Sequence, residues 1–497
     1  MLSEPRRLVV VPRPKLRLPR SRPPSGLPWI LGVVLCFAVT WALLIPPWQS
    51  PDEIQHFAYA QTLVEDHALP GLAGRSATAS SQAAADGAVG ATRGAFAPAP
   101  APPSWIPADA AAYDAAAPHM LRTDGGGPNP AQPNPPLFYA YSDIGYLLSG
   151  SASAFSQLDT MRLFSALLVV VNALGGWLLA GEALGRRRPA QLTAAAVCGL
   201  LPMETFIGAS VNPDSLMVTL WTLALWMGTR VINRRAPVRD VIALCALTAA
   251  AILTKGTSYA LVPPTVLAVA IGWWRRPRVE RRQALLALLP AGLVLVVPVI
   301  GWLSVAHANG QAGVNSFVGG IHATSFNVRQ FLSYVWQYYL PRLPWMYPFR
   351  VTGGLGVYDT WIREGIGDFG WLVVPLPKWV YMASAAVVGG LAVGAVAVVA
   401  RIRNRLRLAL VAFYGLAVIS LFGGLHLYEY RSVIGGNGAL LQGRYALPVV
   451  GVLATIIGLF VVRTPPRLRA AALGLVVVCL LGLQAISLSA LIGAYYL

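Results

Sequence analysis

Three residues that can move protons follow the first long apolar segment of the chain. Asp52 and Glu53 are adjacent carboxylates, and His56 follows Asp52 by four residues. In a helix, that spacing puts Asp52 and His56 on the same face. A carboxylate can take a proton from a hydroxyl group, and an imidazole can orient the carboxylate or shuttle the proton. We therefore expect Asp52, Glu53 and His56 to be catalytic, and Asp52 and Glu53 to be the ligands if the site uses Mg or Mn.

The same stretch also fits an ordinary helix start. Ser50 could cap a helix, Pro51 suits its first position, and Glu53 suits its third position as the acid of a capping box. The helix dipole favours an acid there as well. This structural alternative accounts for Ser50, Pro51 and Glu53, but it does not require His56.

Further charged residues stand where apolar segments begin or end. Asn212 and Asp214 precede such a segment, and an acid there is costly unless it has a function, although Asn212 also suits a helix cap. Lys255 and Arg444 flank other apolar segments; a snorkelling side chain is the structural alternative for Lys255. Together the two cations form a candidate pair for a lipid phosphate, with Arg162 as a weaker third candidate.

The composition is that of a membrane protein. Of 497 residues, 56% are hydrophobic and only 12% are charged, whereas about a quarter are charged in soluble proteins. Runs near the roughly 20 apolar residues that cross a bilayer predict an all-α polytopic fold. We expect about eleven transmembrane helices, at 28–47, 163–184, 190–209, 214–230, 240–254, 258–274, 284–305, 379–400, 408–427, 445–462 and 470–495.

The net charge of +18 follows from basic residues in alternate loops, so it does not indicate a nucleic-acid partner. Of the 38 Lys and Arg residues, 26 lie in the tail 1–27 and in five turns, whereas sixteen of the 20 acidic residues lie with the other loops. By the positive-inside rule, the basic side is cytoplasmic. We expect a multi-pass protein of the cytoplasmic membrane, with a cytoplasmic N-terminus and Asp52 on the outer face.

We expect 28–497 to form one transmembrane domain with two long outer loops, 48–162 and 306–378. Within the first loop, residues 71–134 are rich in Ala and Pro and are predicted to be partly disordered. A helix is predicted at 50–69, and an interfacial or re-entrant helix at 135–150. The second loop is rich in Trp and Tyr, which favour the membrane interface.

Phosphate-binding Gly-rich loops, zinc-spaced Cys/His sets and nucleophile elbows are absent from the sequence. ATP hydrolysis and zinc chemistry therefore have no support. The energy for a reaction would come from a preactivated substrate or from a gradient.

Five motifs in order carry a family resemblance over residues 28–462. The chain resembles the GT-C class of integral membrane glycosyltransferases and, within it, a bacterial family of polytopic membrane proteins known only as a domain of unknown function. The motifs are Pro51-Asp52-Glu53-x-x-His56, Pro135-Pro136-Leu137-Phe138-Tyr139, Asn212-Pro213-Asp214, Phe369-Gly370-Trp371 and Gln442-Gly443-Arg444-Tyr445.

The resemblance implies transfer of a sugar from a polyprenyl-phosphate carrier to a glycan, lipid or protein acceptor at the outer face of the bacterial cytoplasmic membrane. An acid of the first motif, Asp52 or Glu53, would act as general base or hold the acceptor. We expect the substrate-binding residues to be Asn212, Asp214, Lys255, Trp371, Gln442, Arg444 and Tyr445. The chain departs from the class in its 71–134 insertion and in having no large soluble domain after the last predicted helix.

Two alternatives remain at this stage. A transporter or flippase of a lipid-linked saccharide would use the same cations and an apolar groove without chemistry, although no matched halves with broken helices appear. A scaffold subunit of an envelope-assembly complex would tolerate loss of both acids.

Overall fold

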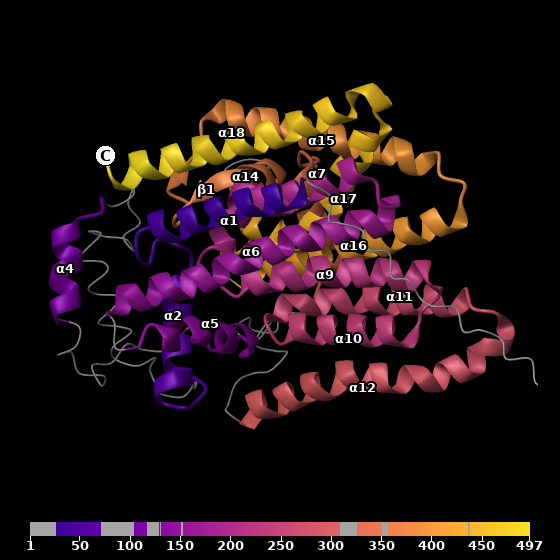
Figure 1. The fold of residues 1–497 in the computed structure, drawn as a ribbon, viewed down its shortest axis with the longest axis horizontal. Coiled ribbons are helices and arrows are strands. Elements are labelled where there is room, and N and C mark those ends of the chain that lie inside the picture. Colours follow the sequence, from indigo (N-terminus) through magenta and orange to yellow (C-terminus); the bar gives the residue numbers. More distant parts are fainter. Residues whose placement is uncertain are drawn as a thin grey trace, which may run out of the picture.

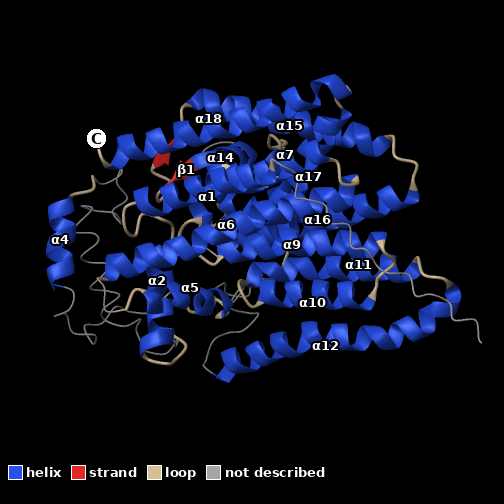
Figure 2. Ribbon diagram, viewed as in Figure 1, coloured by secondary structure: helices blue, strands red, loops and turns tan. Residues whose placement is uncertain are grey.

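The computed structural model describes residues 26–70, 104–116, 129, 131–150, 153–308, 326–349, 356–435 and 438–497. These residues are nearly all helical (Figures 1 and 2). The long helices are α1 (Leu27–Leu44), α6 (Ala154–Leu184), α7 (Arg188–Leu200), α9 (Asp214–Asn233), α10 (Val238–Ile252), α11 (Val262–Trp274), α12 (Arg278–Ala308), α15 (Lys378–Ala400), α16 (Arg405–Ile434), α17 (Val450–Arg463) and α18 (Arg469–Tyr495).

Each of the eleven predicted membrane segments overlaps one or two helices of the structure. Among the described residues, nine helices are long and apolar enough to cross a membrane. A tenth segment is α7 followed by α8 (Pro202–Gly208), which bend by 57° at their junction. The eleventh is α10, which has only 15 residues and is separated from α11 by an extended Lys255 and the 3-10 helix η2 (Gly256–Leu261). The expected all-α membrane fold is therefore confirmed.

The centre of the bundle is α6, which packs against α1, α7 and α9. Its buried face carries small residues, including Gly175 and Gly176. A Cβ on Gly176 would lie 2.7 Å from the Cys198 sulfur on α7. Small residues let helix backbones approach closely where helices pack in a membrane.

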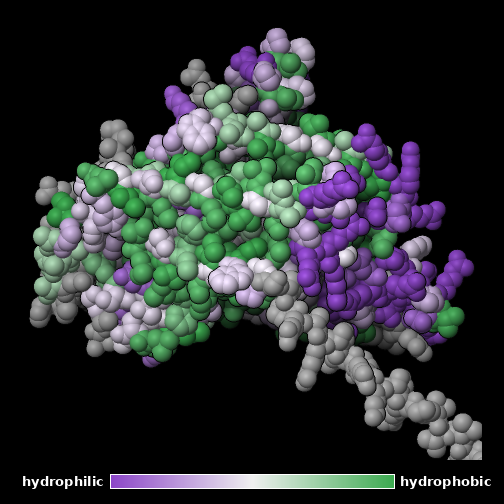
Figure 3. Space-filling model, turned by 45° about the horizontal axis from the view of Figure 1, so that its top comes forward, coloured by the Kyte–Doolittle hydropathy of each residue, from purple (hydrophilic) through white to green (hydrophobic). Residues whose placement is uncertain are grey.

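Hydrophilic residues gather at one end of the bundle (Figure 3). The turns between α9 and α10, α11 and α12, and α15 and α16 lie at this end, on the right of Figure 1, and carry Arg-rich sequence. The charge asymmetry inferred from the sequence is thus also an asymmetry in space. Its assignment to the cytoplasm remains a prediction.

The opposite end carries the short helices α2 (Glu53–Glu65) and α5 (Leu137–Leu148), which pack against each other. Tyr59 and Tyr139 stack between them with ring centroids 3.6 Å apart. With 12 residues, α5 is too short to span a bilayer, as expected for an interfacial helix. Both helices are shorter than the predicted ranges 50–69 and 135–150.

The remaining elements are short. They are α4 (Pro107–Ala116), α13 (Val328–Tyr339), the π-helix η4 (Val357–Glu364), α14 (Gly365–Gly367), the antiparallel strands β1 (Asp368–Phe369) and β2 (Val374–Pro375), and the 3-10 helices η5 (Gly443–Val449) and η6 (Pro466–Leu468). All of them but η6, which lies in the basic turn between α17 and α18, lie outside the turns of the basic end. Most of the tail 1–27 and of the insertion 71–134 lies outside the described residues, so their predicted character is not addressed.

Candidate functional site

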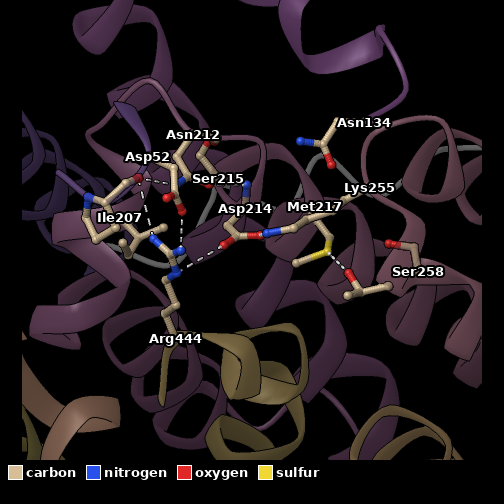
Figure 4. Close-up of polar contacts among 12 residues, drawn as sticks. Asp52, Asn134, Ile207, Asn212, Asp214, Ser215, Met217, Lys255, Ser258 and Arg444 are labelled. Carbon is tan, nitrogen blue, oxygen red and sulfur yellow. Dashed lines mark hydrogen bonds and ion pairs between the residues drawn. The ribbon is translucent and has the colours of Figure 1, made fainter. Parts of the chain in front are cut away.

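Four charged side chains form a line of alternating sign (Figure 4). Arg444 Nη2 donates to Asp52 Oδ2 at 2.6 Å, and its Nε lies 3.9 Å from Asp214 Oδ2. Lys255 Nζ donates to Asp214 Oδ1 at 2.5 Å. The four residues come from the start of α2, the start of α9, the α10–η2 junction and η5. The fold therefore brings together four of the residues singled out from the sequence.

Exposure differs along this line and is highest at Asp52. The side chain of Asp52 is 45% exposed, whereas those of Arg444 and Asp214 are 4% and 0% exposed. Asp214 Oδ2 and Arg444 Nε face each other without a hydrogen bond to either. Buried charges are costly unless they are paired. Asp214 is therefore the fully buried member of this line, and Asp52 is its most exposed member.

Neighbouring groups keep Asp52 charged. Burial is the largest single effect and would raise the pKa of the Asp52 carboxyl, but the charge and hydrogen bond of Arg444, together with nearby His56 and Lys255, hold that pKa below its usual value. Asp52 is therefore an ionised carboxylate near neutral pH, and an ionised carboxylate can accept a proton.

The backbone of Asp52 is unusual. Its φ of 62° is left-handed, a region that Asp and Asn tolerate better than most residues. Asp52 is itself the N-cap residue of α2 and its side chain makes no capping hydrogen bond. The capping-box alternative, with Ser50 as the cap, is therefore wrong, because α2 begins only at Glu53 and Ser50 Oγ makes no hydrogen bond to any described residue.

Asn212 joins the start of α9 to the Asp52 segment. Its Nδ2 donates to the Pro51 carbonyl at 3.1 Å, and its Oδ1 accepts the Asp214 N–H at 2.9 Å. The ring of Tyr445 lies beside both cations, 5.2 Å from Lys255 Nζ and 5.3 Å from the Arg444 guanidinium carbon. Such contacts favour a positive charge.

Gln442 and Trp371 have other surroundings. Gln442 is the N-cap of η5, and its carbonyl accepts the Tyr445 N–H at 3.0 Å. It lines a small pocket with Pro51, Glu364, Asp368 and Arg444, among others. Trp371 Nε1 donates to the Trp48 carbonyl at 3.0 Å, which ties the second outer loop to the segment after α1.

His56 belongs to a second polar group. It is buried, and its Nδ1 lies 2.9 Å from Tyr139 Oη, which accepts from Asn134 Nδ2 at 3.2 Å. Since Asn134 donates to this hydroxyl, the Tyr139 O–H is free to donate to His56. Burial lowers the pKa of His56 to about 3, so the imidazole is neutral at neutral pH. Its described hydrogen bond runs to Tyr139, not to the Asp52 carboxylate.

Glu53 lies in a buried ion pair with Arg162. Arg162 Nε donates to Glu53 Oε1 at 2.8 Å and Nη2 donates to Oε2 at 2.5 Å, with neither side chain exposed. The Val211 N–H also donates to Glu53 Oε1. Arg162 further binds three carbonyls at the end of α1, those of Ala42, Ile45 and Pro46. Both carboxylate oxygens of Glu53 are occupied, so Glu53 fits a structural role better than the predicted catalytic or metal-binding role. Arg162 likewise fits a structural role better than the predicted phosphate binding.

Two contributors, Gly443 and Glu364, were not among the predicted site residues, although Gly443 stands in the fifth motif. A Cβ on Gly443 would collide with the backbone of Gly365 and Thr360, so only glycine lets η5 approach η4 and α14 this closely. The Gly443 N–H donates to Glu364 Oε2 at 2.9 Å. Nothing in the composition of the second outer loop separated Glu364 from its other acids. Among the described residues, no group of three or more His, Cys, Asp or Glu side chains could hold a metal ion.

The family described as "Predicted membrane protein (DUF2142)" matches residues 35–453. The chain belongs to this family. The expected membership in a family of polytopic membrane proteins of unknown function is thereby confirmed. The sequence matches no curated protein.

Two solved structures of other proteins are similar to this chain at low sequence identity. ArnT from Cupriavidus metallidurans, bound to undecaprenyl phosphate, is 16% identical with a TM-score of 0.48, over 93% of this chain and 65% of ArnT. The Archaeoglobus fulgidus oligosaccharyltransferase AglB, in complex with an inhibitory peptide and a dolichol-phosphate, is 12% identical with a TM-score of 0.43, over 95% of this chain and 56% of AglB. The chain thus spans less than two thirds of the length of either protein. At these values, the likeness assigns no activity.

Replacing Arg162 tests the structural role of the buried pair. Arg162→Met leaves Glu53 buried without its counter-charge, so unfolding should become easier by about 3–5 kcal/mol. The control is Asp159→Asn, because Asp159 is 47% exposed and lies 3.9 Å from Arg162. It should change stability by only about 0–1 kcal/mol. Unfolding of the detergent-solubilised variants measures both; equal stability of Arg162→Met and wild type would contradict the assignment.

Adding one methyl group at Gly443 tests the support of Arg444. Gly443→Ala should destabilise the protein and displace Arg444, because the new Cβ meets backbone atoms that cannot move independently. Gly389→Ala in α15, where no atom outside the helix's own backbone lies within 4 Å, is the matched control and should be neutral or slightly stabilising. Thermal unfolding of both variants gives the comparison, and similar midpoints would refute the packing argument.

Proposed function

We propose that this protein is a glycosyltransferase. It moves a sugar from a polyprenyl-phosphate donor to a hydroxyl group of an envelope glycan, lipid or protein at the outer face of the cytoplasmic membrane. One observation carries the proposal: an exposed, ionised Asp52 shares Arg444 with the buried Asp214, at the end of the bundle opposite the basic turns.

Asp52 suits the general base. The acceptor hydroxyl loses its proton to Asp52 while its oxygen forms a bond to the anomeric carbon. The bond from that carbon to the donor phosphate breaks, and the polyprenyl phosphate leaves with the electron pair. A single displacement with the base and leaving group on opposite faces inverts the anomeric configuration.

Arg444 and Lys255 suit the leaving phosphate, because charge-assisted hydrogen bonds to a developing anion lower the barrier. Both cations are already paired with carboxylates in the ligand-free protein. A phosphate that binds Arg444 would compete with Asp52 for it. Binding of the donor would thus release Asp52 to act as base, which favours donor binding before the acceptor.

The proposed roles do not require a metal ion, since Arg444 and Lys255 supply the positive charge. By the positive-inside rule, the basic turns favour a cytoplasmic position for their end of the bundle and an outer position for the Asp52 end. A lipid-linked donor exposed at the outer leaflet could then reach the site without ATP.

Turnover by the purified protein in liposomes tests the proposal. Release of polyprenyl phosphate is measured with a panel of polyprenyl-phosphate sugars, for wild type and Asp52→Asn. Asn keeps the shape of Asp and tolerates the left-handed backbone, so the fold should be retained. Loss of the base should lower the rate by about 10²–10⁴-fold.

The matched control is Asp66→Asn, an exposed acid at the other end of α2, which should retain full activity. Full activity of Asp52→Asn would refute the assignment of the base. If no donor is turned over and the protein instead moves the lipid-linked saccharide across the bilayer, the protein is a flippase.

A further inference from the structure

A cavity of about 220 Å³ lies between η2 and α16. It is mostly apolar, and one of its lining residues, Gly256, directly follows Lys255 in the sequence. The residues that line it are Gly256, Thr257, Tyr259, Ala260, Ser420, Leu421, Gly424, Leu425, Leu427, Tyr428 and Arg431.

The shape of the cavity suits a single hydrocarbon chain. Its α16 residues recur at intervals of three or four, so they form one stripe along the helix. From Ser420 to Arg431 that stripe is about 16 Å long, by the rise of an α-helix. A volume of about 220 Å³ along this length leaves a narrow space. One chain fits such a space better than the paired chains of a diacyl lipid.

The cavity reaches the surface of the bundle. Gly424 is exposed, and no atom lies within 4 Å of the position of its missing Cβ. Of the most apolar stretch of α16, only 22% is buried inside the protein. In a bilayer this surface faces lipid, so a lipid chain can reach the cavity from the side.

Arg431 is the charged group of this cavity. It lies in the last turn of α16, at the opposite end of that helix from the basic turn that begins it. Its guanidinium has no hydrogen bond or ion pair to any described residue, unlike Lys255 and Arg444. An arginine at the end of a membrane helix without an acidic partner is suited to bind an anion.

We propose that the cavity holds the first isoprene units of a polyprenyl phosphate, and that Arg431 binds its phosphate group when the lipid enters, before Arg444 and Lys255 hold it in the reaction. The identity of this lipid rests on the proposed function. The narrow apolar space, its side opening and the arginine at one end, which has no ion pair among the described residues, match a single-chain lipid with an anionic head. Arg431 can bind the phosphate without displacing a carboxylate, whereas Arg444 and Lys255 are already paired.

Two glycines on α16 give a matched pair of variants. Gly424 lines the cavity and Gly423 does not, yet both are exposed and have open space around the missing Cβ. Gly424→Leu should fill the cavity and weaken polyprenyl phosphate binding by about tenfold or more. Gly423→Leu should bind as wild type does. Native mass spectrometry of the detergent-solubilised full chain, titrated with polyprenyl phosphate, measures the affinity.

Two further ligands test the phosphate contact. Arg431→Gln should weaken polyprenyl phosphate by about tenfold while leaving binding of the uncharged polyprenol unchanged. Phosphatidylglycerol, an anionic lipid with two chains, should compete poorly. Equal effects of Gly424→Leu and Gly423→Leu, or displacement by phosphatidylglycerol at equal concentration, would overturn the inference.

The binding data separate this inference from the proposed reaction. Polyprenyl phosphate binding that depends on Gly424 and Arg431, in a protein that turns over no donor, supports the cavity assignment while the glycosyltransferase proposal fails. Turnover by wild type, with unchanged binding in both cavity variants, sustains the enzyme and refutes the cavity assignment.

Discussion

The structure around the site depends on Arg444, which shares its guanidinium between Asp52 and Asp214. An arginine stays charged at any physiological pH and cannot be left buried without a counter-charge. Asp214 is fully buried and is also bound to Lys255, so it is the permanent partner. Asp52 is the partner that a ligand can replace. The resting site is therefore assembled but internally neutralised, and an incoming phosphate would take the place of Asp52 on Arg444 and free that carboxylate.

Several neighbouring residues hold Arg444 and Asp52 in position, and this accounts for their presence in the sequence. Glu53, next to Asp52, is bound by Arg162, and this fixes the segment between α1 and α2 on α6. Asn212 ties the same segment to the start of α9. Gly443 lets η5 pack directly on the backbone of α14. Adjacent acids in one motif thus serve different ends: Asp52 faces the surroundings, whereas Glu53 anchors the fold.

Much of the membrane architecture could be predicted because hydropathy and charge are local properties of the sequence. The partners of the charged residues could not, since Asp52 lies 392 positions before Arg444 and Glu53 lies 109 before Arg162. The capping-box interpretation failed because the helix begins three residues after Ser50, whose hydroxyl makes no hydrogen bond within the part of the chain that the structure describes. The sequence analysis paired Lys255 with Arg444 as candidates for a lipid phosphate, but it did not reveal that Asp214 lies between them.

The most direct test of the central claim is the affinity of the protein for polyprenyl phosphate in wild type and Asp52→Asn, measured in parallel in the same detergent. If Asp52 competes with the phosphate for Arg444, its neutralisation should make binding tighter, because Arg444 no longer has to give up a charged partner. Weaker binding to Asp52→Asn would contradict the account, since it would show that Asp52 helps to hold the phosphate instead of competing with it.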